Sequence, residues 1–129
     1  MRVQITKTLS RYDLCSNDKE WQVVVRVLGP GKVLSVLFPE DREPDVEDRP
    51  PSEVVEIIAE EHKRYLYRGN AAQEAETLAW MREHAEALDH AWAAGMAREL
   101  TASAMAALEQ AAELLKRYPP VAPQESVTA

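Results

Sequence analysis

The side chains that could perform chemistry in this sequence are three histidines and one cysteine. His62, His84 and His90 lie in stretches with helical periodicity, and Cys15 lies beside a turn signal. Two histidines that bind one metal ion from a single helix are spaced three or four residues apart, whereas His84 and His90 are six apart. Neither His-Glu-x-x-His nor Glu-x-x-His occurs. We therefore expect no metal and no other cofactor.

Covalent catalysis has little support in the motifs. The sequence contains no Gly-x-Ser-x-Gly, and Gly29-Pro30-Gly31 has a proline where a phosphate-binding loop needs free backbone N–H groups. An enzyme remains an alternative if folding brings together two of His62, His84, Glu83 and Cys15 in a pocket that perturbs their pKa values. The first expectation is a protein that is not an enzyme.

The elements that would position these residues follow from periodicity and turn signals. Residues 2–38 alternate apolar and polar side chains in three runs joined by short turns, which predicts a three-stranded antiparallel meander with its second strand in the centre, covered on both faces. Residues 39–51 hold four prolines and many charges, so we expect an extended, solvated acidic loop. Residues 52–68 predict an amphipathic helix with Ser52 as its N-cap. The fold class is therefore α+β.

Residues 70–118 predict a long helix or a helical hairpin. Sixteen of the 48 residues from 71 to 118 are alanine, and the apolar positions step by three and four, with a shift of phase near Gly95. An unbroken helix of that length would measure about 72 Å. A break between residues 94 and 103 and a continuous helix both stay open. We expect residues 1–118 to form one domain and residues 119–129 to form a flexible tail.

An alanine-rich helical surface buries little area unless a second helix lies close against it. We therefore expect a protein partner, and self-association as a homo-oligomer such as a dimer. The residues that we expect to contact the partner are Trp80, Met81, His84, Trp92, Met96 and Leu100.

The charge is negative and unevenly distributed. The net charge is −7, and residues 40–61 hold ten acids against two bases. Such a chain is repelled by phosphate backbones, which argues against direct binding of nucleic acid. No run of residues is long and apolar enough for a membrane span, and a lone cysteine fits a reducing compartment, so we expect a cytoplasmic protein. The candidate acidic face comprises Glu40, Asp41, Glu43, Asp45, Glu47 and Asp48.

The first function that these patterns predict is a non-enzymatic interaction module, namely an adaptor, assembly factor or regulatory subunit that acts through its helical surface. One alternative is a small acidic inhibitor, of the type that phages and mobile elements encode, which would block a basic groove that binds nucleic acid. The other is a small enzyme that uses His62 and His84.

Overall fold

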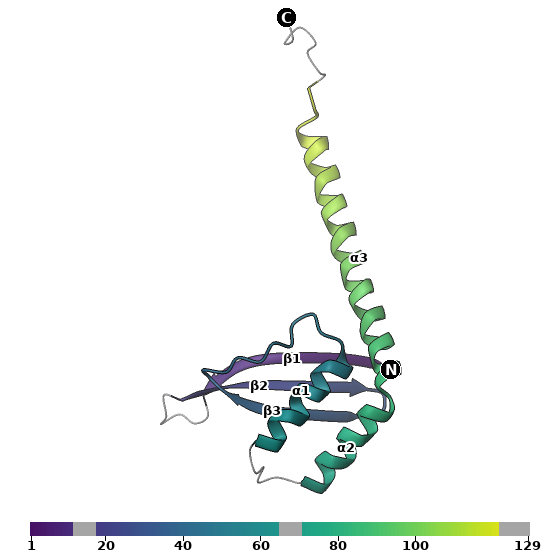
Figure 1. The fold of residues 1–129 in the computed structure, drawn as a ribbon. Helices are drawn as coiled ribbons and strands as arrows, with labels where there is room; N and C mark the ends of the chain where they lie inside the picture. Colours follow the sequence, from purple (N-terminus) through teal and green to yellow (C-terminus); the bar gives the residue numbers. More distant parts are fainter. Residues whose placement is uncertain (12–17, 65–70, 122–129) are drawn as a thin grey trace, which may run out of the picture. The chain divides into compact units, whose positions relative to one another are not determined.

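The computed structural model describes residues 1–11, 18–64 and 71–121. Three strands, β1 (Arg2–Arg11), β2 (Lys19–Leu28) and β3 (Lys32–Pro39), form an antiparallel sheet in the order β1-β2-β3 (Figure 1). The predicted meander, its central second strand and the α+β class are therefore confirmed. The chain divides into two compact units, Met1–Gly95 and Met96–Ala129, which are described one at a time.

The turn between β2 and β3 depends on two glycines. Gly29 and Gly31 have φ angles of 103° and 71°, in the region that side chains with a Cβ rarely adopt. The Gly31 amide donates a hydrogen bond of 3.0 Å to the Val27 carbonyl, which closes the turn. This geometry sets the register in which Val25 lies opposite Leu34.

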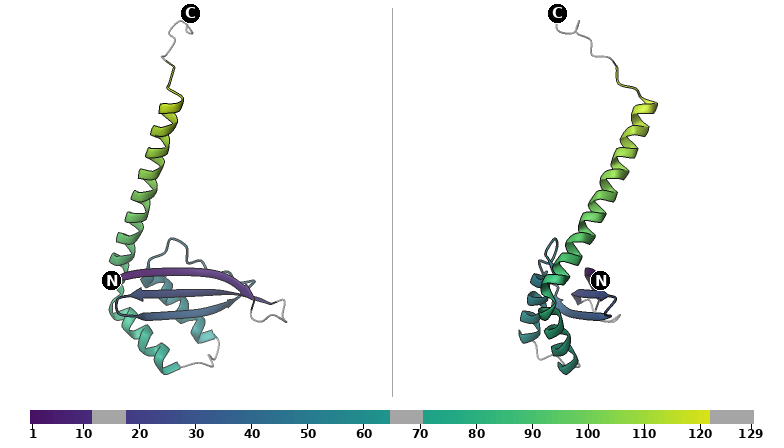
Figure 2. Two further views of the ribbon diagram at one scale, coloured as in Figure 1. Left: turned by 180° about the vertical axis from the view of Figure 1, so that it is seen from behind. Right: turned by 90° about the vertical axis from the view of Figure 1, so that its right-hand side faces the viewer.

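The core lies between one face of the sheet and the helices α1 (Pro51–Arg64) and α2 (Ala71–Glu83), which lie on that same face (Figure 2). Alternate residues of β2 point into it, so that Val23 and Val25 are completely buried. On the other face of β2, Val24 is 6% exposed, whereas Leu28 at the end of the strand keeps 42% of its surface exposed. The expectation that both faces of β2 would be covered is therefore met at Val24 and not at Leu28.

The acidic loop is not the solvated connection that its composition predicts. Pro44 and Val46 are buried, and Val46 belongs to the hydrophobic core. The Lys7 ammonium lies 2.8 Å from a Glu43 carboxylate oxygen and 3.2 Å from one of Glu47, and these partners raise the pKa of Lys7. The loop folds onto the sheet because one aliphatic side chain and one cation of β1 hold it there.

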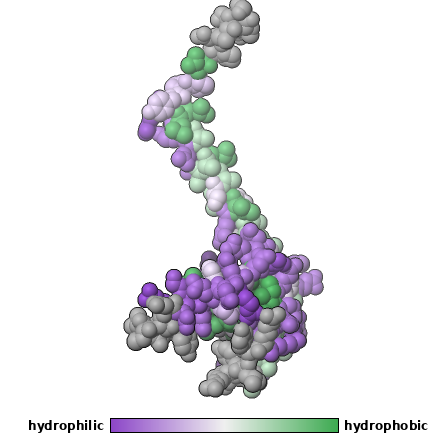
Figure 3. All heavy atoms as spheres, turned by 60° about the vertical axis from the view of Figure 1, so that its left-hand side comes forward, coloured by the Kyte–Doolittle hydropathy of each residue, from purple (hydrophilic) through white to green (hydrophobic). Residues whose placement is uncertain are grey.

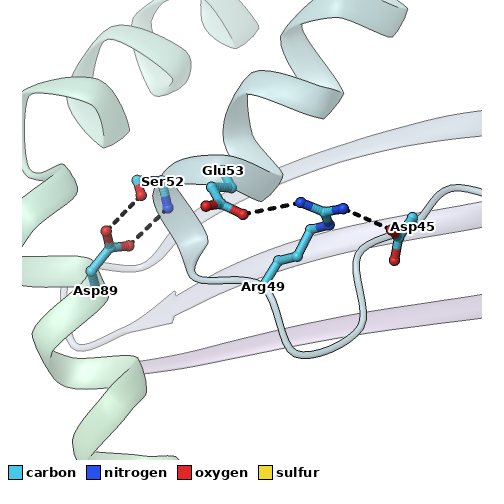
Figure 4. A network of polar contacts seen from close by, with 5 residues as sticks. All are labelled: Asp45, Arg49, Ser52, Glu53 and Asp89. Carbon is cyan, nitrogen blue, oxygen red and sulfur yellow. Dashed lines mark hydrogen bonds and ion pairs between the residues drawn. The ribbon is translucent and has the colours of Figure 1, made fainter.

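The first turn of α1 is satisfied by a carboxylate from another helix. Asp89, in α3 (Ala85–Arg117), accepts hydrogen bonds from the Ser52 amide at 2.9 Å and from the Ser52 hydroxyl at 2.5 Å (Figure 4). The expected role of Ser52 as N-cap is therefore wrong, because α1 begins at Pro51 and the Ser52 hydroxyl donates instead of accepting. Asp89 also places a negative charge at the positive end of the helix dipole.

The helical region is interrupted at His84 and not between residues 94 and 103. The Trp80 carbonyl accepts from both the backbone amide of His84, at 3.0 Å, and its Nδ1, at 2.8 Å. A side-chain bond that competes for a helix carbonyl bends the helix locally. α3 then runs as one helix to Arg117, so a hairpin that turns between residues 94 and 103 is wrong.

An ion pair between α1 and α2 makes stability depend on pH. Arg82 donates to both Glu56 oxygens, at 2.7 and 2.8 Å, and this bidentate contact lowers the pKa of Glu56 below its ordinary value of 4.5. A carboxyl whose pKa is lower in the folded chain stabilises the fold above that ordinary value and loses this contribution as the pH falls.

We expect Glu56→Gln to lower the unfolding free energy by about 0.5–1 kcal/mol at pH 7, because both groups are half exposed. As the pH falls from about 5 to about 3, the unfolding free energy of the wild type should approach that of the variant. Urea unfolding at a series of pH values measures it. A difference that persists at about pH 3 would show that the ion pair is not its origin.

Candidate interaction surface

The first three residues expected to bind a partner lie in the core of the first unit or against it. Met81 is 1% exposed and belongs to the hydrophobic cluster, so its side chain cannot contact a partner. Trp80 is half-buried against that cluster and stacks on His84, with ring centroids 4.2 Å apart. The Lys32 ammonium lies 5.8 Å from the Trp80 ring. These contacts give Trp80 and His84 roles within the unit.

The other three expected residues lie along α3, on both sides of the boundary between the units. Trp92 belongs to the first unit, while Met96 and Leu100 belong to the second. Leu100 is 66% exposed. It begins a series of exposed apolar side chains that extends beyond the six predicted contact residues.

This series lies on the helical part of the second unit, residues 96–117, where hydrophobic residues follow one another along the helix (Figure 3). Leu100, Leu108 and Leu115 have 66%, 69% and 55% of their surface exposed. Exposed apolar residues that form a continuous patch of several hundred Å² mark a binding surface in most soluble proteins. We call this surface the leucine–alanine stripe. Its members are Ala97, Leu100, Thr101, Ala104, Met105, Leu108, Ala111, Leu114 and Leu115.

The opposite side of the same helix is polar. At 100° per residue, Glu99, Glu109, Glu113 and Arg117 fall away from the stripe. The hydroxyl of Thr101, within the stripe, donates to the Ala97 carbonyl at 2.8 Å, so it presents mainly its methyl group. The helix is amphipathic although all its residues from 97 to 117 are exposed.

The acidic candidates do not form a set of free carboxylates. Glu43 and Glu47 pair with Lys7, and Asp45 lies 2.7 Å from an Arg49 nitrogen, a contact that lowers the pKa of Asp45 (Figure 4). Arg49 also reaches Glu53 at 3.2 Å. The remaining three candidates, Glu40, Asp41 and Asp48, are exposed. Half of the expected acidic face is therefore neutralised within the chain.

A pocket of about 690 Å³ opens between the end of β3 and the end of α1. Its lining includes Phe38, Glu61 and His62. The buried Glu61 carboxylate accepts from Arg42 at 2.5 Å, and His62 Nε2 lies 3.0 Å from the Ser35 carbonyl. Because a carbonyl only accepts, Nε2 carries a proton. Both groups thus have structural partners.

The pocket brings together few of the residues that the enzyme alternative requires. Of the four named above, its lining includes His62 and neither His84 nor Glu83. Cys15 lies outside the described residues. Across the three described ranges, no three His, Cys, Asp or Glu side chains cluster as a metal site would need.

No helix in the described part of the chain has both the length and the apolar composition that crossing a bilayer demands. Comparison of the chain with protein-family models, with curated proteins and with solved structures gives no match, so the site itself is the basis for assigning a function.

Proposed function

We propose that this protein is a non-enzymatic interaction module that binds another protein chain through the leucine–alanine stripe of residues 97–115. The observation that carries the proposal is the exposure of Leu100, Leu108 and Leu115 on one side of a helix whose glutamates lie on the opposite side. An amphipathic helix that offers apolar side chains at intervals of three and four is a common recognition element, which a partner helix or groove covers.

The energetics favour a covered stripe. The helical residues 96–117 span about 33 Å, and most helical stability in proteins comes from packing of an amphipathic face and not from helix propensity. Each leucine that passes from water into an interface contributes about 1.5–3 kcal/mol. Binding of a partner therefore stabilises the helix and removes its apolar side chains from water together.

The two alternatives have weaker support. An acidic inhibitor needs free carboxylates in phosphate-like order, whereas Glu43, Asp45 and Glu47 are paired with cations of the same chain. An enzyme needs reactive groups in one pocket, and Glu61 there is already paired with Arg42.

Affinity purification from the native host tests the proposal with two double variants of the full chain. Leu108→Glu/Leu115→Glu places two charges in the stripe, and Ala102→Glu/Ala106→Glu places two on the polar side of the same helix. We expect wild type and the polar-side control to recover the same bound chains, including further copies of the protein itself. The stripe variant should recover at least tenfold less, because an unpaired charge in an apolar interface is costly.

Far-ultraviolet circular dichroism of both variants controls for loss of the helix. Equal recovery by wild type and the stripe variant, or recovery of no bound chain by wild type, would contradict the proposal.

A further inference from the structure

We infer that the chain covering the stripe is a second copy of this protein, whose helix 97–115 runs antiparallel to the first with the two-fold axis at residue 106. The inference rests on the proposed function and names its partner. It follows from the order of large and small residues along the stripe.

Two interleaved series with a period of seven residues run along the centre of the stripe, and Leu100, Met105 and Leu114 flank them. Ala97, Ala104 and Ala111 form the small series, and Thr101, Leu108 and Leu115 form the second series, which is large at two of its three positions. A period of seven places both series along the seam between two paired helices.

In an antiparallel pair centred on residue 106, each residue lies opposite a residue of the second copy, and the two residue numbers add up to 212. Leu115 then lies opposite Ala97, Leu108 opposite Ala104, and Thr101 opposite Ala111. Every layer therefore contains one alanine and one larger side chain. The four leucine–alanine layers are equal in volume and the two threonine–alanine layers are smaller, so the two helix axes can keep nearly one separation along the seam.

A parallel pair would place each residue opposite its own copy. Layers of two alanines at Ala104 would then alternate with layers of two leucines at Leu108, and no single axial separation would suit both.

The size complementarity provides a direct experiment on the full chain. Ala104→Leu alone creates two layers of paired leucines in the homodimer, and Leu108→Ala alone creates two layers of paired alanines. Analytical ultracentrifugation should show a dimer for wild type and a dissociation constant raised about tenfold or more for each single variant.

An equimolar mixture of these two variants should regain an affinity close to that of wild type, because the two layers formed by positions 104 and 108 again pair one leucine with one alanine. If the stripe instead bound a groove of fixed shape on a different protein, mixing the two variants would not restore the affinity. Circular dichroism of each variant verifies that the helix is retained.

Spin labels test the direction in a Cys15→Ser background, which removes the single native cysteine. In the antiparallel dimer, the two labels at residue 113, one on each copy, are about 21 Å apart along the helix axis, whereas the two labels at residue 106 lie at the same level. The distance between the labels should therefore be longer at 113 than at 106. Equal distances would indicate a parallel pair and overturn the antiparallel arrangement.

The inference also fails if wild type is a monomer at every concentration tested, or if the mixed variants do not regain affinity. If the monomeric chain nevertheless captures a different protein through the stripe, the proposed function stands and only the second copy is excluded.

Discussion

Replacing Leu88 with alanine is expected to lower the unfolding free energy of the unit Met1–Gly95 by about 2–5 kcal/mol. Leu88 is completely buried and belongs to the same hydrophobic cluster as Ile58 and Met81. The truncated side chain leaves a cavity that the sheet and α1 cannot fill, and this cost adds to the lost transfer of apolar surface from water.

Leu108→Ala is the matched control, because it makes the same chemical change in the same helix α3 at a residue that is 69% exposed. We expect it to change the stability of the first unit by less than about 0.5 kcal/mol. Urea unfolding followed by tryptophan fluorescence suits the comparison, since Trp21, Trp80 and Trp92 all belong to that unit. Equal losses for the two leucine variants would contradict the assignment of Leu88 to the core and of Leu108 to a binding surface.

Replacing Asp89 with alanine is expected to lower the unfolding free energy of the same unit by about 2–3 kcal/mol. The carboxylate accepts two hydrogen bonds from Ser52 at the start of α1, and hydrogen bonds to a charged group contribute about 1.5–3 kcal/mol. Its charge also interacts favourably with the helix dipole. The substitution removes the partner of the part-buried Ser52 amide.

Glu86→Ala controls for the loss of an acid from the first turn of α3, because Glu86 is exposed. We expect a change within about 0.5 kcal/mol for it. The Ser52→Ala variant and the Ser52→Ala/Asp89→Ala double variant complete a double-mutant cycle, and a coupling energy would assign part of the loss to the bond from the Ser52 hydroxyl, because the Ser52 amide remains in every variant. Independent, additive losses would show that the hydroxyl bond does not contribute.

The sequence predicted the local elements well where periodicity and turn chemistry agree. Alternating valines and Gly29-Pro30-Gly31 determine the meander, because a period of two and positive φ angles leave few other structures. Alanines without an internal proline determine the helical region up to Pro119. The expected C-terminal part of the first helix and residue 70, where the second helical region was expected to begin, lie outside the described residues, as does the tail from residue 122.

Tertiary contacts decided what composition could not. The loop that looks solvated is held by Val46 and Lys7, and the cap of α1 comes from Asp89, which is 37 residues away from Ser52 in the sequence. The helix is interrupted at His84, whose ring also bonds the Trp80 carbonyl, and local propensity does not reveal this.

By itself, the sequence determined which residues are apolar and with what period, because these depend only on neighbours along the chain. The tertiary structure alone decided which apolar residues are buried in the chain's own core and which remain exposed. Met81 and Leu108 look alike in the sequence, yet the first is 1% and the second 69% exposed. Burial depends on contacts between distant segments, and no local pattern encodes it.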